Sequence, residues 1–222
     1  MRLPALDERL RAVAELFTAC DIGADIGADH GRLSCYLLDQ RICRRMIVSD
    51  ISADSLAKAR RLLALHGLDD KAEFAVADGL DALTGPVDVA AICGMGGKLV
   101  SGILLRGKDR LQNAALVLSC HTDIPLLRRT IGQIGYHISR ETLVRAHNRF
   151  YIVMRAEPGI RDAYTEKELY LGPLLMRDRP PLWTRYLKWR EGVVQCEQGH
   201  DTQLQWIREE LNRETADGEK RS

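Results

Sequence analysis

The sequence predicts an α/β protein: a mostly parallel seven-stranded sheet with helices on both faces, followed by a small C-terminal helical hairpin. Short apolar runs alternate with segments whose apolar residues recur at helical spacing, which is the pattern of strands joined by crossover helices. The last two apolar runs follow each other directly and predict an antiparallel pair that closes the sheet. After Pro158-Gly159, charged residues become frequent and only helical spacing remains.

Each element follows from local spacing and end signals. In order, we expect a helix at 3–17, a strand at 22–26, a helix at 31–40, strand 46–48, helix 53–66, strand 73–77, strand 87–93, helix 98–105, strand 116–118, helix 124–134, and strands 136–144 and 149–156. Ser52 is placed to cap the third helix and Gly67 to end it, while Pro125 suits a first helical turn. The run 87–93 lacks alternation, as expected for a strand buried on both faces.

Two helices, 164–179 and 181–213, are expected to pair as a hairpin after the composition changes. The break between them is placed at Arg179-Pro180-Pro181, since proline ends a helix. The apolar seam of the pair is expected at Leu182, Trp183, Tyr186, Leu187, Val193, Val194, Leu204, Ile207 and Leu211. A domain boundary is therefore expected between residues 159 and 160.

Composition excludes several classes of protein. The 222 residues include 45% apolar and 28% charged residues, with a net charge of +1, so a strongly basic nucleic-acid binder is not indicated. Arg2, Asp7 and Glu8 interrupt the N-terminal apolar residues, and no run approaches the roughly 20 apolar residues of a membrane span. The six cysteines form no Cys-x-x-Cys pair. We expect a cytoplasmic protein with buried, reduced thiols.

The loop after the first expected strand, Asp-Ile-Gly-Ala-Asp-His-Gly (25–31), is the most informative motif. Glycines there let the backbone come close to a ligand. A dinucleotide-binding loop reads Gly-x-Gly-x-x-Gly, whereas this loop has Asp29 where a middle glycine might be expected. Two carboxylates beside the bend suit a positively charged ligand better than a pyrophosphate.

Acids also end the second and third expected strands. Asp50, roughly 20 residues after the glycine loop, can bind both hydroxyls of a ribose in NAD or S-adenosylmethionine enzymes. The alternative is a helix N-terminal acid favoured by the macrodipole. Asp78, followed by Gly79, can accept a hydrogen bond from an adenine amino group, as is typical of S-adenosylmethionine sites; the alternative is a turn aspartate.

Three glycines in the four residues Gly94-Met95-Gly96-Gly97 follow the fourth expected strand. They let the backbone lie against a planar ring or a reacting methyl group, whereas an ordinary strand-to-helix turn needs one glycine. Because the carboxyl ends of parallel strands meet at one edge, all of these loops are expected to converge on one ligand.

Together these segments resemble a known family. Asp-Ile-Gly-Ala-Asp-His-Gly (25–31), Val-Ala-Asp-Gly-Leu (76–80) and Ile-Cys-Gly-Met-Gly-Gly (92–97) resemble the bacterial tRNA adenine-22 N1-methyltransferases, the TrmK family. The resemblance extends to Glu-Leu-Tyr-Leu-Gly-Pro-Leu-Leu (168–175) and covers about 3–211. It implies a Rossmann-like class I methyltransferase domain (1–159) and a C-terminal coiled-coil-like domain (160–222). It also implies methyl transfer from S-adenosyl-L-methionine to N1 of an adenine in the tRNA D-arm, leaving S-adenosyl-L-homocysteine.

Residue roles follow from the same resemblance. The implied cofactor contacts are Asp25, Gly27, Asp29, His30, Asp50, Ile51, Asp78, Gly79, Gly94 and Met95. Gly96 would line the path between the sulfonium and the target base. Basic residues could contact the tRNA phosphates, and the candidates are Arg140, Arg145, Arg149, Arg185 and Lys188. For Arg185 and Lys188 a solvated helix face is the alternative.

Methyl transfer to a ring nitrogen requires few catalytic groups from the protein. Positioning can supply much of the acceleration, and no general base is needed because adenine N1 carries no proton. No metal is required, and the six histidines show no metal-ligand spacing. The product is a cation, so a nearby carboxylate would stabilise the developing charge, and Asp29 is the catalytic candidate. His30, at a helix start, more often caps or packs than catalyses.

Other interpretations stay open. The segment 119–123 stands where the family is expected to carry a Gln-Pro-type segment, so the residues that hold the target base there are not assigned. Cys120 beside His121 suggests a nucleophile, but adjacent residues on a strand point to opposite faces. The rival classes are a methyltransferase for another RNA or a small molecule, an NAD-linked oxidoreductase and a non-catalytic RNA-binding module. A monomer is favoured.

Overall fold

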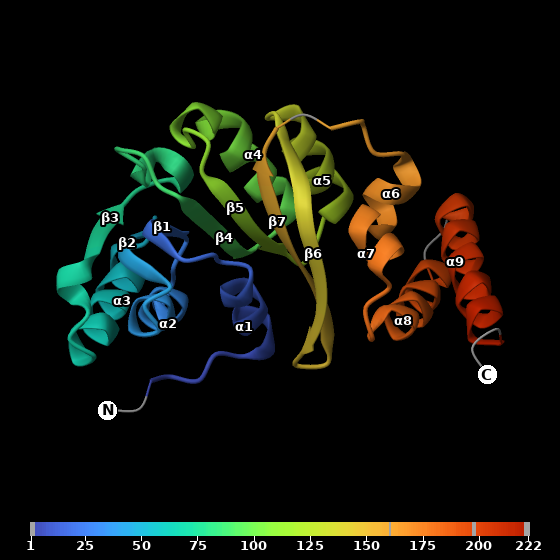
Figure 1. Ribbon diagram of the computed structural model, residues 1–222, viewed down its shortest axis with the longest axis horizontal. Helices are drawn as coiled ribbons and strands as arrows, with labels where there is room; N and C mark the ends of the chain where they lie inside the picture. Colours follow the sequence, from blue (N-terminus) through green and yellow to red (C-terminus); the bar gives the residue numbers. More distant parts are fainter. Residues whose placement is uncertain (1–2, 160, 197–198, 220–222) are drawn as a thin grey trace.

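Seven strands form one sheet in the computed structural model, which describes residues 3–159, 161–196 and 199–219, and side chains as far as residue 214. The strands are β1 (Cys20–Ile26), β2 (Cys43–Asp50), β3 (Ala72–Val76), β4 (Val89–Met95), β5 (Ala115–Cys120), β6 (Tyr136–Ala146) and β7 (Arg149–Pro158). Their order across the sheet is β3-β2-β1-β4-β5-β7-β6 (Figure 1). β7 runs antiparallel to β5 and β6, and the other neighbouring pairs are parallel. The predicted mostly parallel sheet with an antiparallel terminal strand is confirmed.

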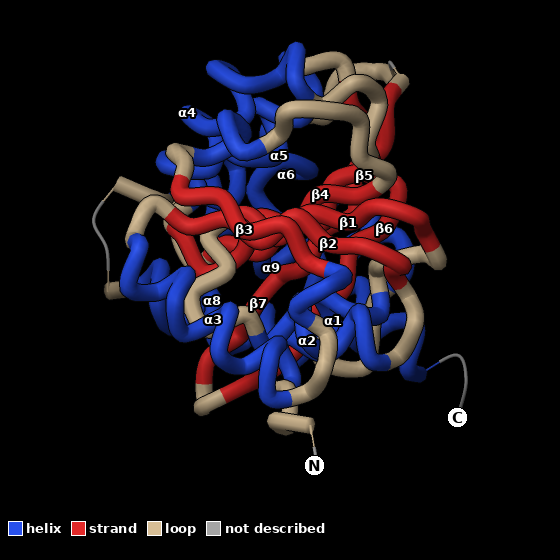
Figure 2. Tube along the Cα trace, turned by 90° about the vertical axis from the view of Figure 1, so that its left-hand side faces the viewer, coloured by secondary structure: helices blue, strands red, loops and turns tan. Residues whose placement is uncertain are grey.

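Helices cover both faces of this sheet. The helices α1 (Glu8–Glu15), α2 (Arg32–Asp39) and α3 (Ala53–Leu65) lie on one face, and α4 (Gly97–Gly107) and α5 (Ile124–Gln133) on the other (Figure 2). Short 3₁₀ turns lie at Asp69–Lys71, Gly79–Ala82 and Lys108–Arg110. Side chains of β5 serve both faces in alternation: Val117 packs with α1–α3, while Leu116 and Leu118 pack with α4 and α5.

The first helix is shorter than predicted. Asp7 has extended backbone, and its carboxylate accepts a hydrogen bond from the Leu10 backbone N–H at 2.8 Å, so α1 begins at the next residue. The apolar spacing that predicted a helix over 3–17 still marks buried positions. Leu6 and Phe17 are buried, but they pack from outside the helix.

After residue 159 the described residues form four helices rather than the predicted two: α6 (Glu166–Leu171), α7 (Pro173–Asp178), α8 (Trp183–Gln195) and α9 (Asp201–Glu219). Gly172 (φ 108°) and Pro173 divide the predicted helix 164–179, because proline lacks the N–H that would continue it. A turn with Gly199 (φ 82°) precedes α9. The hairpin is therefore α8 against α9 (Figure 1), and the predicted pairing of 164–179 with 181–213 is wrong.

A buried ion pair joins these helices to the α/β part. Arg128 of α5 and Glu141 of β6 lie 2.9 Å apart, both with fully buried side chains. Arg128 also donates to the Leu169 carbonyl at 2.7 Å, at the end of α6. The other oxygen of Glu141 accepts from the Leu174 N–H at 2.9 Å, at the start of α7. One charge pair thus fixes the α6–α7 corner.

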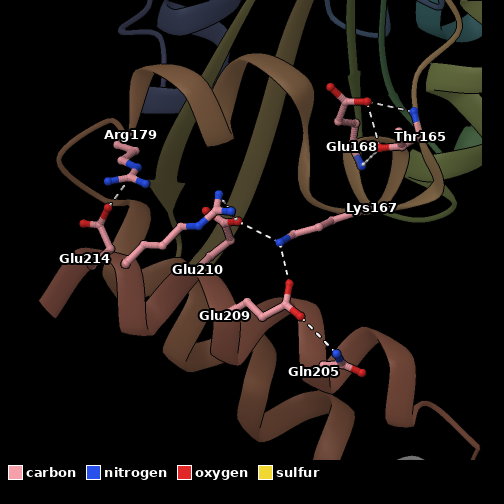
Figure 3. Close-up of polar contacts among 9 residues, drawn as sticks. Thr165, Lys167, Glu168, Arg179, Gln205, Glu209, Glu210 and Glu214 are labelled. Carbon is pink, nitrogen blue, oxygen red and sulfur yellow. Dashed lines mark hydrogen bonds and ion pairs between the residues drawn. The ribbon is translucent and has the colours of Figure 1, made fainter. Parts of the chain in front are cut away.

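A second set of polar contacts attaches α9 (Figure 3). Lys167 of α6 reaches between Glu209 and Glu210 of α9, at 2.8 and 2.9 Å, and Glu210 is fully buried. Arg179, just after α7, pairs with Glu214 at 3.3 Å. Charged residues of α9 therefore hold it against α6 and α7.

The apolar core continues from the sheet into the C-terminal helices. One cluster of buried side chains contains Leu118 of β5, Leu175 of α7, Trp183 of α8 and Ile207 of α9. The domain boundary expected at residues 159 and 160 stays a prediction. In the described ranges, none of the helices is both long and apolar enough to cross a membrane.

Candidate cofactor and RNA site

The loops that follow the parallel strands converge on one cavity of about 660 Å³, a size typical of small-molecule sites. Its walls come from the carboxyl ends of β1, β2 and β4, the residues after β3, and the helices α1, α2 and α4. All ten predicted cofactor residues line it: Asp25, Gly27, Asp29, His30, Asp50, Ile51, Asp78, Gly79, Gly94 and Met95. The convergence expected from strand-end positions is therefore present.

Asp50 fixes the loop after β1. Its Oδ2 accepts from the Asp29 N–H at 3.0 Å, and its Oδ1 accepts from the Ser52 N–H at 2.9 Å. The Ser49 carbonyl accepts from Gly27 N–H at 2.8 Å and from Ala28 N–H at 2.9 Å. Each oxygen of Asp50 keeps a further lone pair that can accept from a hydroxyl group of a ligand.

Asp25 lies at the base of the cavity and is 4% exposed. The Ser34 hydroxyl donates to its Oδ2 at 2.7 Å. Burial raises the pKa of Asp25 to about 6, and the Asp50 charge adds to the rise, whereas the Ser34 hydrogen bonds oppose it. A cationic group in the cavity would favour the ionised form of this carboxyl.

The glycines of the predicted motifs bring two loops into contact. Gly27 (φ 74°) lies against the side chain of Met95, where any Cβ would collide with the methionine methyl group. Gly97 packs against backbone, because a Cβ there would lie 2.6 Å from the carbonyl oxygens of Thr122 and Asp123. Gly96 faces Thr122 and is not among the residues that line the cavity, so its place on the methyl path stays a prediction.

The catalytic candidate Asp29 has an exposed carboxylate at the cavity mouth. Its side chain is 67% exposed, and the His30 Nδ1 lies 2.6 Å from its Oδ2. The backbone of Asp29 is left-handed (φ 49°), which aspartate tolerates better than most residues. His30 is thus positioned to orient the Asp29 carboxylate.

Sequence reasoning missed the contribution of α1. Arg9 lines the cavity, and its Nη1 lies 3.4 Å from the position that a Cβ on Gly94 would take. Arg9 also lies over the Tyr151 ring, 5.8 Å from its centroid. Asp7 lines the same wall. The helix-start signal at Asp7 was visible in the sequence, but nothing local shows that this helix end faces the cofactor loops.

Charge distinguishes the cavity from a dinucleotide site. Among described residues, its lining carries five aspartates, at positions 7, 25, 29, 50 and 78, against Arg9 and Arg32. This acidic excess favours a cationic ligand and opposes a pyrophosphate.

The predicted RNA-contacting residues divide into two sets. Arg145, in β6, and Arg185, in α8, line a common groove of about 510 Å³ with His147 and Glu8. Glu8 adjoins Asp7 and Arg9 of the cavity wall, so the groove leads towards the cavity. The lining of the groove does not include the other predicted residues, Arg140, Arg149 and Lys188, whose side chains are exposed.

The Cys120 nucleophile has no support in the geometry. Cys120 is 1% exposed, and burial raises the pKa of its thiol to about 12. His121 is exposed, as expected for the neighbouring residue of a strand. The segment 119–123 instead supports the turn at Gly97, whose N–H donates to the Thr122 carbonyl at 3.0 Å.

The fold and the cavity define the class. A parallel sheet with the reversed β7 inserted beside β5, an acid at the end of β2 and an acid-rich cavity at the strand ends are those of a Rossmann-like S-adenosylmethionine-dependent methyltransferase. The family model of the tRNA (adenine(22)-N(1))-methyltransferases, TrmK, matches residues 23–217. The chain belongs to this family.

Individual relatives agree with this assignment. The tRNA (adenine(22)-N(1))-methyltransferase of Bacillus subtilis is 29% identical over 210 residues, covering 89% of this chain and 88% of the relative. The Streptococcus pneumoniae protein Sp1610, solved with S-adenosyl-L-methionine, has a TM-score of 0.88 at 26% identity, covering 93% of this chain and all of that one. M. capricolum TrmK, solved with S-adenosyl-homocysteine, shares the fold (TM-score 0.78, 22% identity, 96% of this chain and 98% of that one covered). The predicted family, reaction and methyl donor are confirmed.

Proposed function

We propose that the acid-rich cavity holds the S-adenosyl-L-methionine and that the methylation of adenine 22 N1 in tRNA takes place at the mouth of this cavity. The observation that carries the proposal is the lining of five aspartates against two arginines, at strand ends that lack a Gly-x-Gly-x-x-Gly loop. A sulfonium and an ammonium group suit these carboxylates, whereas the pyrophosphate of NAD would be repelled.

Residue roles follow from position. Asp50 is proposed to bind the ribose hydroxyls, since each of its oxygens has a lone pair to spare beyond its backbone contact. Asp78 and Gly79 are proposed to face the adenine edge. Asp25 is proposed to face the ammonium side, and Arg9, beside Gly94, to pair with the carboxylate.

When bound, S-adenosyl-L-methionine supplies a methyl group activated by its sulfonium. The chain's own residues position the acceptor and stabilise charge. Asp29 is proposed to face the target adenine, because its carboxylate is at the cavity mouth and is held by His30 at 2.6 Å. There it would stabilise the positive charge that develops on the ring as N1 forms its new bond. The target base would have to leave its stack to reach this position.

The groove beside α1 is proposed to bind the tRNA backbone. Arg145 and Arg185 would contact phosphates, while the hairpin turn with His147 brings the groove towards the cavity wall at Asp7 (His147 Nε2 to Asp7 Oδ2, 3.8 Å). A cytoplasmic monomer stays a prediction.

One experiment tests the function directly. The protein is incubated with methyl-labelled S-adenosyl-L-methionine and unmodified tRNA, and the labelled nucleoside is identified and mapped. We expect 1-methyladenosine at position 22; label in guanosine, in cytidine or in no nucleoside would refute the proposal. Calorimetry should show binding of S-adenosyl-L-homocysteine and no binding of NAD. This result would exclude the NAD-linked oxidoreductase.

A further inference from the structure

Two cysteine thiols meet at the edge of the sheet opposite the cavity. Cys20 is the first residue of β1 and Cys43 the first of β2, and the two are register partners in this parallel pair. Both are free thiols, and their Sγ atoms lie 3.1 Å apart. The cavity lies at the carboxyl ends of the same strands, so the proposed methyl transfer does not use them.

The backbone geometry allows these thiols to form a bond. Neighbouring strands lie about 4.8 Å apart, which is within the span of about 4.4–6.8 Å between the Cα atoms of disulfides. The sulfur atoms need to approach by about 1 Å to reach bonding distance. A Cβ on Gly23 would lie 2.8 Å from the Cys43 Sγ, so a glycine at position 23 leaves the space that this thiol occupies.

A groove gives small molecules access to Cys20. Cys20 is half-buried and lines a hollow of about 560 Å³ that holds three arginines and two aspartates: Arg41, Arg44, Arg155, Asp21 and Asp88. A hydrogen bond with the Cys43 thiol lowers the pKa of Cys20, and Arg155 adds to this effect, against the opposing effects of burial and of the two aspartates. The same shared hydrogen bond, together with burial, raises the pKa of Cys43. Because Cys20 lines the hollow and Cys43 is buried, Cys20 is the thiol that a small molecule reaches first.

We propose that Cys20 and Cys43 form a thiol–disulfide exchange site for small disulfides of the glutathione type. The Cys20 thiolate attacks one sulfur of the small disulfide, forming a mixed disulfide and releasing one small thiolate. Cys43 then gives its proton to the released thiolate and attacks the Cys20 Sγ. The Cys20–Cys43 disulfide forms, and the second small thiol leaves after taking up a proton. Two protein thiols are oxidised, and one small disulfide is reduced to two thiols.

Three of the other cysteines are expected to be much less reactive than Cys20. Burial raises the pKa of Cys35 to about 11 and of Cys120 to about 12, and it also raises the pKa of Cys93. These thiols should react slowly, since the thiolate is the reactive form. Cys196 is exposed and would compete, so Cys196→Ser is the background for the test.

The test uses full-length Cys196→Ser protein and mixtures of oxidised and reduced glutathione. After the remaining thiols are alkylated, mass spectrometry of the intact chain and of its peptides locates each disulfide. We expect two thiols to disappear together, a Cys20–Cys43 peptide, and a Tm several degrees higher, because the bond constrains the unfolded chain. Adding Cys43→Ser should halt the reaction at glutathione on Cys20, and adding Cys20→Ser should leave Cys43 reduced.

The proposal has clear contrary outcomes. It is overturned if Cys20 and Cys43 stay reduced in oxidised glutathione, if another pair is joined first, or if Cys43 reacts equally well after Cys20→Ser. Both serine variants keep the cavity residues, so measured binding of S-adenosyl-L-homocysteine shows whether each variant is folded.

Discussion

The buried carboxyl group of Asp25 makes the stability of the fold depend on pH. Folded, it holds its proton to about pH 6 because it is buried; unfolded, it loses the proton near the ordinary aspartate pKa of about 3.9. Between these values the folded state binds more protons, so stability falls as pH rises, by up to about 3 kcal/mol in total.

Asp25→Asn should remove this dependence. Asparagine does not titrate and can still accept from the Ser34 hydroxyl, so the Tm of the variant relative to wild type should rise from pH 4 to pH 6 and then level off. Calorimetric scans without ligand at several pH values measure the difference. A Tm difference that does not change with pH would contradict the account.

Asp29 and Arg9 are expected to show opposite kinetic phenotypes. Asp29→Asn keeps the size and tolerates the left-handed backbone, but it removes the charge proposed to stabilise the transition state. We expect kcat to fall roughly 10- to 100-fold, with the Kd of S-adenosyl-L-homocysteine changed less than about 3-fold. Arg9→Ala should mainly raise that Kd. Equal losses of rate and affinity in Asp29→Asn would make it a cofactor ligand instead.

For single residues, the sequence could predict most of those that line the cavity, but not every residue that joins them there. The ten proposed cofactor residues share one cavity because strand-end position follows from the order of elements alone. Arg9 could not be found that way, since its place depends on how α1 packs against the sheet. Gly96 was expected on the methyl path; it lies beside Thr122 and outside the cavity lining, so that role stays a prediction.

The start of α4 requires a residue without a side chain. Gly97→Ala would place a Cβ 2.6 Å from the Thr122 and Asp123 carbonyl oxygens, and backbone cannot move aside cheaply. We expect a loss of about 1–3 kcal/mol and weaker ligand binding, because the Met95 loop would shift. Gly102→Ala, in the same helix, meets only the flexible end of Arg106 at 3.3 Å and should be neutral or stabilising by up to about 1 kcal/mol. Urea unfolding compares the two, and equal effects would refute this argument.

The β6–β7 hairpin and α8 together should set tRNA affinity. Arg145→Ala and Arg185→Ala should each weaken binding several-fold at moderate salt and lower the salt slope by about one, with kcat at saturating tRNA unchanged. Lys71→Ala is the control, since Lys71 is exposed beside β3, at the opposite end of the sheet. Filter binding at several salt concentrations measures the slope. An equal effect of Lys71→Ala would show only a general charge effect.

Element boundaries were predictable where local chemistry determines them. Ser52 caps α3, accepting from the Ser55 N–H at 3.3 Å, as its sequence position predicts. The predicted strand at 46–48 is shorter than β2, because exposed Arg44 and Arg45 interrupt the apolar run from which the strand was predicted. The division at Gly172-Pro173 had a visible signal, but the regular apolar spacing on both sides outweighed it.

For the whole molecule, the continuous core predicts one cooperative unfolding unit. All three tryptophans, Trp183, Trp189 and Trp206, lie in α8 and α9, so fluorescence reports the C-terminal helices, while far-UV circular dichroism reports the whole chain. Since one buried cluster joins β5 to α9, the two signals should change at the same urea concentration. Two separate midpoints would instead favour an autonomous C-terminal domain, as the sequence division at 159 and 160 suggests.

Removing the buried ion pair that connects the C-terminal helices to the sheet should separate the fluorescence and circular-dichroism transitions. Glu141→Gln leaves the buried Arg128 guanidinium without its charge partner, which costs about 3–5 kcal/mol, and it weakens the corner between α6 and α7. We expect the fluorescence midpoint to fall below the circular-dichroism midpoint in this variant. Glu166→Gln is the matched control: its partner Arg129 adjoins Arg128 on α5, but the pair is exposed and should contribute less than about 1 kcal/mol. If Glu166→Gln lowers both midpoints as much as Glu141→Gln does, the buried pair is not what couples the C-terminal helices to the sheet.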